Sequence, residues 1–327
     1  MLNIKFKSAI AFLSLVFALS PFAINCVNAK ENSCLTEQAS SQDEFSINKD
    51  GALVGYFGKS ENVVIPEGVT SIDNFVFSDH TEIKSVKIPS KVKTIGNYAF
   101  SGCSSLRNVE LAGDIESIGS FCFSNCTALE EVYIGSELES IGDLCFWGCE
   151  SLKAINVDEE NESFASVDGV LFNKDVTNLI LCPSCLEKDY VMPNSVVNIG
   201  AYAFFGCDKI ESIKFSENLK AIGDMAFYKC SSLKSVQFGN NLKVIGSCAF
   251  GDCTSLNEVK LPESMVSIGS SAFFDCVGMT DIKILSKDVH VGHHAFYYCD
   301  KLTIHAERGS TAEKYAIKNK IKFESIK

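Results

Sequence analysis

The chain has 327 residues, 41 acidic and 29 basic side chains, and a formal net charge of −12 at pH 7. This acidic excess argues against a nucleic-acid partner, because clustered Lys and Arg bind the phosphate backbone. Only five histidines are present, and no nucleophile–base pair, carboxylate cluster or phosphate-binding loop stands out. We therefore expect no enzyme and no cofactor.

Residues 1–29 have the pattern of a secretory signal peptide. A short basic head precedes the apolar stretch 9–19, which is too short to span a bilayer. Small residues at the −3 and −1 positions predict cleavage after Ala29. The alternatives are lipidation at Cys26, disfavoured by the asparagine before it, and an uncleaved anchor. No further apolar run of spanning length follows, so we expect an exported chain without a transmembrane segment.

Two short segments precede the regular part of the chain. Residues 30–44 are polar and patternless, which predicts a flexible leader. Apolar residues then flank Asp50-Gly51, a pair typical of a hairpin turn. We expect this hairpin to cap the first repeat, because an open strand edge promotes aggregation.

A 23-residue period follows, with the pattern Ile-Gly-x-x-Ala-Phe-x-x-Cys-x-x-Leu-x-x-Val-x-Φ, where Φ is Ile, Leu or Phe. So short a period predicts a solenoid in which each repeat contacts only its neighbours. Leu233, Val236 and Phe238 alternate as in a strand, whereas residues 249–256 have helical spacing. We expect an α+β repeat solenoid of about nine 23-residue repeats, with a helix on the wall opposite the strand.

One repeat is longer than the others. Cys149 and Cys207, two successive cysteines of the repeat pattern, are 58 residues apart. This distance is 23 plus 35, so one repeat carries 12 inserted residues. Alternating apolar residues within 164–183 predict a second hairpin there. We expect two blocks, 45–157 and 158–303, in one continuous solenoid. After Thr303 the pattern ends, and a capping box at 310–313 predicts a C-terminal helical cap over 304–327.

Fifteen cysteines raise the question of disulfides. Eight occupy one repeat position among inward-facing apolar residues, where a free thiol acts as a small buried group. Turns stacked about 4.8 Å apart would also permit bridges; we favour a column of reduced thiols. The lone Cys182-x-x-Cys185 lacks further zinc ligands nearby in the sequence. Three crowded histidines, at 290, 293 and 294, are a weak metal signal, and we expect no metal.

The repeat resembles the BspA-like, treponemal-type leucine-rich repeats. The resemblance covers residues 45–327 and includes the proline of Ile88-Pro89 and Leu261-Pro262 and the ending Gly309-Ser310-x-Ala312-Glu313. It implies a leucine-rich repeat array that is secreted or held at the cell surface, used in adhesion or host interaction, with relatives in anaerobic bacteria and some mucosal protists. It implies no shared catalytic site. The partner would be a protein or glycan of a cell surface or extracellular matrix. The alternative is a structural or self-associating envelope protein without a discrete ligand.

Two outward columns are the candidate binding residues. The first follows the repeat valine, where lysines on an acidic protein favour an acidic protein or glycan; the alternative is an ordinary solvated sheet face. The second follows the repeat phenylalanine and is aromatic, which suits a sugar or an apolar partner; the alternative is a stripe of rings packed on one another. The first column comprises Lys214, Gln237, Lys260, Lys283 and, in the first block, Tyr133; the second comprises Trp147, Phe205, Tyr228, Phe274 and Tyr297.

Overall fold

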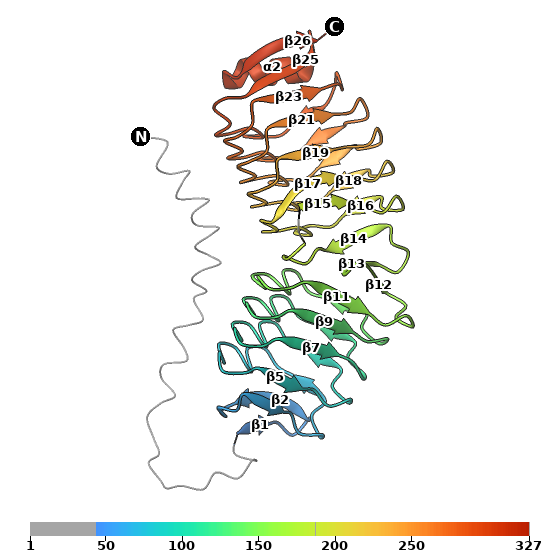
Figure 1. Ribbon diagram of the computed structural model, residues 1–327, viewed down its shortest axis with the longest axis vertical. Helices are drawn as coiled ribbons and strands as arrows, with labels where there is room; N and C mark the ends of the chain where they lie inside the picture. Colours follow the sequence, from blue (N-terminus) through green and yellow to red (C-terminus); the bar gives the residue numbers. More distant parts are fainter. Residues whose placement is uncertain (1–43, 187, 327) are drawn as a thin grey trace, which may run out of the picture. The chain divides into compact units, whose positions relative to one another are not determined.

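The computed structural model describes residues 44–186 and 188–326 (Figure 1). The predicted signal peptide, and all of the predicted leader except residue 44, lie outside these ranges. The described chain is a β-solenoid of about twelve turns with one helix near its end, α2 (Thr311–Asn319). Within these ranges, no helix is both long and apolar enough to cross a membrane.

Each turn adds one strand to a long-strand sheet and one to a short-strand sheet, and pairing between turns is parallel. The long-strand sheet is interrupted between β5 and β7 and again between β11 and β15. Its strands are β3 (Asn62–Val64), β5 (Ser85–Lys87), β7 (Asn108–Leu111), β9 (Glu131–Ile134), β11 (Ala154–Val157), β15 (Lys188–Val191), β17 (Ile210–Lys214), β19 (Ser235–Gln237), β21 (Glu258–Leu261), β23 (Asp281–Ile284), β25 (Thr303–Glu307) and β26 (Lys322–Ile326).

The short-strand sheet forms the neighbouring wall and also takes in the two hairpins. Its break falls between β10 and β12, at the long repeat. Its strands are β1 (Phe45–Ile47), β2 (Ala52–Tyr56), β4 (Ser71–Ile72), β6 (Thr94–Ile95), β8 (Ser117–Ile118), β10 (Ser140–Ile141), β12 (Phe164–Val167), β13 (Val170–Asn173), β14 (Asn178–Leu181), β16 (Asn198–Ile199), β18 (Ala221–Ile222), β20 (Val244–Ile245), β22 (Ser267–Ile268) and β24 (His290–Val291).

The predicted helical wall is wrong, and with it the α+β class. Residues 249–256 form tight turns rather than a helix. The flanking Cys248 and the internal Asp252 have left-handed backbones, with φ of 52° and 58°, which an α-helix does not tolerate. The amide of Phe250 donates to the carbonyl of Ala272 in the next turn, at 2.7 Å, instead of to a residue four positions earlier. The helix-like spacing therefore comes from turns that direct every third or fourth side chain inward.

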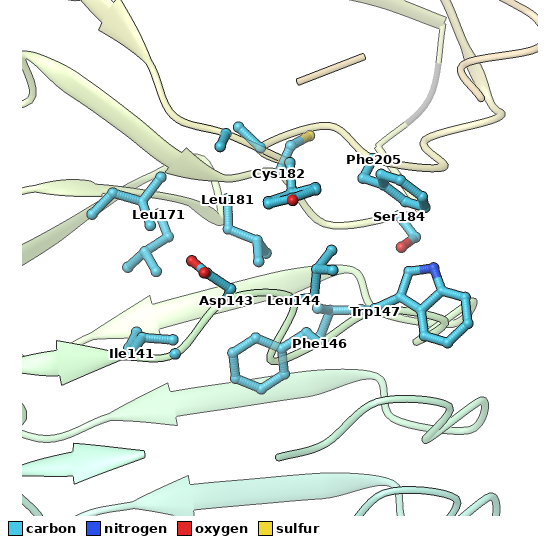
Figure 2. A pocket seen from close by; sticks show the side chains of 16 residues that line it. Ile141, Asp143, Leu144, Phe146, Trp147, Leu171, Leu181, Cys182, Ser184 and Phe205 are labelled. Carbon is cyan, nitrogen blue, oxygen red and sulfur yellow. The ribbon is translucent and has the colours of Figure 1, made fainter. Parts of the chain in front are cut away.

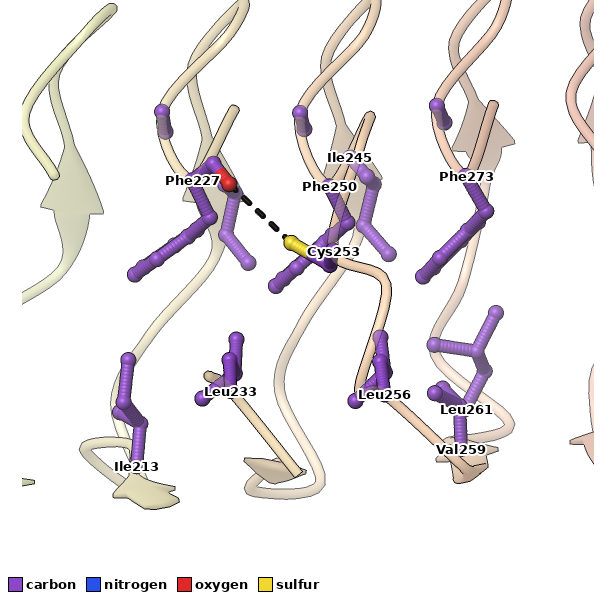
Figure 3. Packing of buried hydrophobic residues seen from close by; sticks show 14 of the residues in the cluster. Ile213, Phe227, Leu233, Ile245, Phe250, Cys253, Leu256, Val259, Leu261 and Phe273 are labelled. Carbon is purple, nitrogen blue, oxygen red and sulfur yellow. Dashed lines mark hydrogen bonds between the residues drawn. The ribbon is translucent and has the colours of Figure 1, made fainter. Parts of the chain in front are cut away.

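A ladder of phenylalanine rings fills the core (Figure 3). Phe227 is fully buried between Phe204 and Phe250, with ring centroids 4.6 and 5.0 Å away. Burying such a side chain stabilises the fold by about 1.5–3 kcal/mol. The ladder members are Phe77, Phe100, Phe123, Phe146, Phe204, Phe227, Phe250, Phe273 and Phe296. The core divides into two clusters that meet at β13, where Leu171 packs with the first and Phe172 with the second.

The cysteine column does more than fill space. The Cys253 thiol donates to the carbonyl oxygen of Phe227, with Sγ and O 3.1 Å apart (Figure 3). The same bond, at 3.0–3.2 Å, is made by Cys103, Cys126, Cys149, Cys230, Cys276 and Cys299. All thirteen cysteines within residues 44–326 are free thiols, in agreement with the predicted reduced column.

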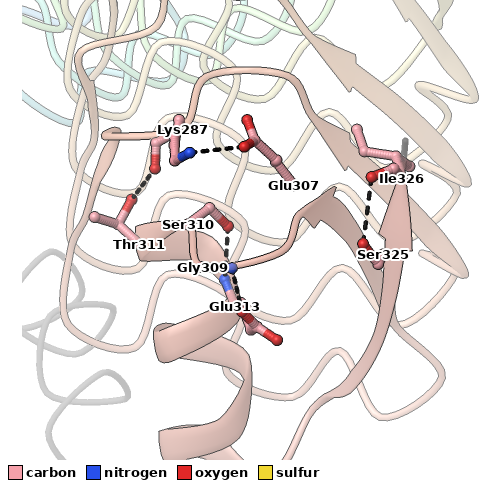
Figure 4. Close-up of polar contacts among 8 residues, drawn as sticks. All are labelled: Lys287, Glu307, Gly309, Ser310, Thr311, Glu313, Ser325 and Ile326. Carbon is pink, nitrogen blue, oxygen red and sulfur yellow. Dashed lines mark hydrogen bonds and ion pairs between the residues drawn. The ribbon is translucent and has the colours of Figure 1, made fainter.

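The two predicted hairpins and the C-terminal helix are present. β1 pairs antiparallel with β2, and β12, β13 and β14 form an antiparallel meander inside the long repeat. At the start of α2, Ser310 accepts a hydrogen bond from the amide of Glu313, whose carboxylate accepts from the amide of Gly309 (Figure 4). The first of these bonds satisfies an amide that the first helical turn leaves unpaired, and the second ties the preceding residue to the helix. β26 then adds in parallel to β25.

Candidate functional site

The first predicted column of the second block is assembled on the long-strand sheet. Lys214 is in register with Gln237, and Lys260 with Lys283. The pair Ser235–Glu258 sets β19 beside β21 so that Gln237 lies next to Lys260. All four side chains are exposed. They alternate with buried or half-buried neighbours along each strand, so they stand on the solvent face, about 4.8 Å apart from strand to strand. We call these four residues the lysine column.

The charges of the lysine column are not neutralised by the described part of the protein. Within residues 44–326, no carboxylate lies within 4.0 Å of the ammonium groups of Lys214, Lys260 or Lys283. Some lysines elsewhere on the surface are paired. Lys234 pairs with Glu211, and Lys153 with Glu130, each at 2.6 Å across adjacent turns. The lysine column thus places three cations on one sheet face without the carboxylate partners that Lys153 and Lys234 have.

Acidic side chains border the lysine column on one side. Glu258 and Asp281 lie two residues before Lys260 and Lys283 on the same strands and therefore on the same face. Asp281 is engaged within the protein, because hydrogen bonds from His305 and Thr280 lower its pKa. Glu258 has no such hydrogen bond in the described structure. The basic column and the acidic one run side by side across β21 and β23.

Sequence reasoning missed His305, which extends the lysine column. β25 places His305 in register with Lys283. Its Nε2 lies 2.7 Å from Oδ1 of Asp281, and its Nδ1 lies 3.6 Å from Oε2 of Glu324. The repeat pattern ends at Thr303, so the motif does not reach this position. The alternation Thr303, Ile304, His305 within β25 is the signal that would have found it.

Tyr133 is not brought to the lysine column. It lies on β9, in the piece of the long-strand sheet formed by β7, β9 and β11, between the register partners Glu110 and Asn156. Its hydroxyl donates to the carboxylate of Asp158 at 2.6 Å, which raises the pKa of the tyrosine and lowers that of the aspartate. Because the strand pairing breaks between β11 and β15, Tyr133 is not in register with the lysine column.

The aromatic column is largely a stripe of rings packed on each other. Phe205 stacks on Tyr228 at 5.5 Å, and Phe274 on Tyr297 at 6.2 Å, measured between ring centroids. Between these pairs the Tyr228 ring covers Gly251, where an added Cβ would lie 2.7 Å from the ring. Trp147 instead meets Phe121 edge-on at 6.5 Å. Most rings of this column therefore pack on their neighbours, as in the stripe given above as the alternative to a binding surface.

A further aromatic stack was not anticipated. Phe75, Tyr98 and Phe121 stack on one another at 5.0 and 4.9 Å between centroids. All three residues have a left-handed backbone conformation, with φ between 55° and 63°. This position, two residues before the core phenylalanine, is occupied by many residue types along the chain, so no sequence pattern marks it.

The long repeat leaves a cleft of about 90 Å³ beside the short-strand sheet (Figure 2). Trp147 and Phe205, both from the predicted aromatic column, contribute to its lining. Phe146, Leu171 and Leu181 form part of its apolar wall. The sequence predicted the insertion but not this cleft, because the cleft depends on how the inserted hairpin packs against the preceding turn.

In the described structure the cysteine and histidine motifs make separate local contacts. Cys182 is buried and Cys185 is half-buried; the Cys185 thiol donates to the carbonyl of Glu150 at 3.1 Å. The rings of His293 and His294 lie 3.8 Å apart between centroids. No group of three or more His, Cys, Asp or Glu residues suited to a metal is found across residues 44–186 and 188–326.

A family model described as the BspA type leucine rich repeat region matches the chain in six copies, over residues 55–174 and 182–303. This match covers most of the solenoid and is interrupted only at residues 175–181, within the long repeat. No curated protein sequence matches the chain.

Solved structures of bacterial proteins share the fold. The pneumococcal vaccine antigen PcpA is 23% identical, with a TM-score of 0.63, over 86% of this chain and 82% of the antigen. A leucine-rich cell surface protein from Faecalibacterium prausnitzii is 23% identical, with a TM-score of 0.57, over 86% of this chain and 98% of its own. A leucine-rich repeat protein from Eubacterium ventriosum is 21% identical, with a TM-score of 0.64, over 79% and 80%.

Proposed function

The chain belongs to the BspA-type leucine-rich repeat family, and we propose that it is an exported protein that binds an acidic macromolecule through the lysine column. The signal-peptide pattern of residues 1–29 supports export, to the medium or the cell surface. The cell-surface description of the Faecalibacterium prausnitzii protein fits the same setting. We propose a binding function and not a catalytic one.

One observation carries this proposal: three lysines stand on one face of the long-strand sheet and lack carboxylate partners within the described chain, whereas Lys153 and Lys234 are paired. Lys260 and Lys283 stand on adjacent strands, and Lys214 stands two strands from Lys260 in the same parallel sheet, so little backbone conformational entropy is lost when they bind. A polyanion with regularly spaced negative groups, on an acidic protein or a sulfated or carboxylated glycan, is complementary to this spacing. Solvent-exposed contacts of this type weaken as salt screens them.

The test compares the exported chain, residues 30–327, with a triple variant carrying Lys214→Glu, Lys260→Glu and Lys283→Glu. Binding is measured to matrix and cell-surface extracts and to two defined probes, heparin and polyglutamate, at several salt concentrations. We expect affinity for the probes to fall by at least about tenfold, since each exposed charge contact contributes up to about 1 kcal/mol. The salt dependence should flatten as well.

A matched control carries Lys91→Glu, Lys220→Glu and Lys243→Glu. These lysines are also exposed and have no carboxylate within 4.0 Å among the described residues, but they lie outside the lysine column. The control changes net charge by the same amount, so loss of binding in both variants would indicate a response to total charge. Undiminished binding in the column variant would refute the proposed surface.

A second candidate function is self-association into a structural layer. Phe57 is 72% exposed and Val64, on the outer strand β3, is 62% exposed. Among the residues that the structure describes, β3 pairs on one side only, with β5. An apolar strand edge of this kind promotes edge-to-edge pairing. Light scattering of the exported chain and of a Val64→Lys variant, each at several concentrations, separates the two functions. Assembly that grows with concentration and is abolished in the variant favours the structural role.

The remaining predictions on organisation are part of the proposal. The hairpin β1–β2 would cap the first turn, and α2 with β26 would cap the last one, because each covers an end where a turn lacks a neighbour. We place the boundary of the two blocks near residue 157, and both blocks in one continuous solenoid. Truncation at either end should then lower the stability of the whole array.

A further inference from the structure

The cleft at the long repeat exists because the phenylalanine ladder is interrupted there. Up to Phe146 each ring stacks on the ring one turn away, the last pair, Phe123 and Phe146, at 5.6 Å between centroids. The ladder resumes only at Phe204, which meets Tyr190 at 5.8 Å and Phe227 at 4.6 Å. Between Phe146 and Phe204 the hairpin strands β13 and β14 replace a regular turn, and they leave a space of about 90 Å³.

The lining of this space selects an apolar group. Leu144, Leu171 and Leu181 project into it, as Figure 2 shows, and Phe146 closes one side. A cavity of about 150 Å³ holds a benzene molecule, so a cleft of about 90 Å³ is on the scale of a single side chain and not of a whole small-molecule ligand. We therefore expect it to receive the end of one aliphatic or aromatic side chain. Transfer of an apolar side chain out of water into this lining favours binding.

The polar groups around the space determine which charge a partner can carry next to the side chain that enters. Asp143 is exposed and extends its carboxylate toward the space in Figure 2. It also raises the pKa of Tyr202, another lining residue, although burial contributes more to that shift. The lining contains no Lys, Arg or His. A cation beside the entering side chain is therefore favoured over an anion.

We propose that this cleft is a docking site for one aliphatic or aromatic side chain of a protein partner, carried next to a lysine or arginine. The site is independent of the lysine column, which lies on the other sheet. Loss of either binding activity would leave the other in place.

Trp147 is the only tryptophan of the chain and lines the cleft, so its fluorescence reports occupancy. The probes are three blocked dipeptides: acetyl-Phe-Arg-amide, acetyl-Ala-Arg-amide and acetyl-Phe-Glu-amide. We expect the first to give a saturable change. The alanine peptide should bind about tenfold more weakly or worse, because it buries no ring. The glutamate peptide should bind about two- to fivefold more weakly, because it places an anion near Asp143.

Two variants test the cleft itself. Asp143→Lys should reverse the preference between the arginine and glutamate peptides, while Asp114→Lys, an exposed site elsewhere with the same charge change, should keep it. Ser184→Phe fills the cleft from its rim and should abolish the response, with folding checked by circular dichroism. Absence of a saturable response, equal affinity of the phenylalanine and alanine peptides, or an unchanged preference in Asp143→Lys would each overturn the proposal. If Ser184→Phe does not fold, the peptide preference of Asp143→Lys still tests the proposal.

Discussion

The carbonyl oxygen of Phe227 accepts two hydrogen bonds, one from the amide of Cys230 at 3.2 Å and one from the thiol of Cys253, a turn later, at 3.1 Å. The second bond links adjacent turns through a side chain, and the repeat places it at the same position in most turns. The cysteine column is therefore a hydrogen-bonded ladder as well as part of the apolar core.

This geometry predicts that serine replaces the ladder cysteines better than alanine does. Cys253→Ser keeps a donor within reach of the Phe227 oxygen, whereas Cys253→Ala loses the bond and leaves a small void. We expect the alanine variant to be less stable than the serine variant by about 0.5–1.5 kcal/mol, the usual net contribution of one hydrogen bond. Urea denaturation of both variants measures this. A serine variant less stable than the alanine variant would mean that the thiol serves mainly as an apolar group.

The phenylalanine ladder predicts damage that spreads between turns. Phe227→Ala removes a fully buried ring and should lower the free energy of unfolding by about 3–5 kcal/mol. Because each turn is held by its neighbours, amide exchange should accelerate in the turns of Phe204 and Phe250 as well. Gln237→Ala, on an exposed position of the next strand, is the control and should change little. A melting temperature within a degree or two of the parent would contradict the role assigned to Phe227.

The buried thiols predict instability at alkaline pH. Burial raises the pKa of Cys103 to about 12, whereas an unfolded cysteine ionises near pH 8.5. Above pH 8.5 the unfolded state thus loses the proton that the folded state retains. The stability contributed by the buried neutral thiol is present in full below pH 8.5 and is lost as the pH rises toward 12, by about 1.4 kcal/mol per pH unit for one such thiol.

Denaturant titrations at pH 7, 9 and 10 measure this loss, and a Cys103→Val variant is the control, because its stability should decline less steeply. The ladder thiols should also react slowly with a thiol reagent in the folded protein and completely after unfolding. If most of these cysteines were found in disulfides, the assignment of a free-thiol column would be wrong.

The period of 23 residues was enough to predict much of this fold. It determines which side chains face inward, and it places Lys260 opposite Lys283 one turn apart. Asp50-Gly51 and the capping box at Ser310 marked their local structures because few backbone conformations suit those residues. The wall with helical spacing was misassigned as a helix. Its turns place Cys248 in the left-handed backbone conformation, and the sequence gives no sign of this because the position is neither Gly nor Asn. The cleft beside Phe146 and the position of His305 depend on packing between segments, which a repeat pattern does not encode.

The acidic column beside the lysine column predicts a variant with stronger binding. The Glu258 carboxylate lies two residues from Lys260 on the same face and repels a polyanion placed on the lysine column. Glu258→Gln removes this repulsion without changing the size of the side chain, and it should raise the affinity for heparin by about two- to fivefold at low salt. The gain should shrink as salt increases, since exposed charges are screened over about 10 Å at 0.1 M. Glu263→Gln, a charge removal in the loop after β21, should give a smaller gain, and titration calorimetry of the three proteins compares them. Equal gains in both variants would mean that heparin responds to net charge alone, and no gain in either would mean that it binds away from β21.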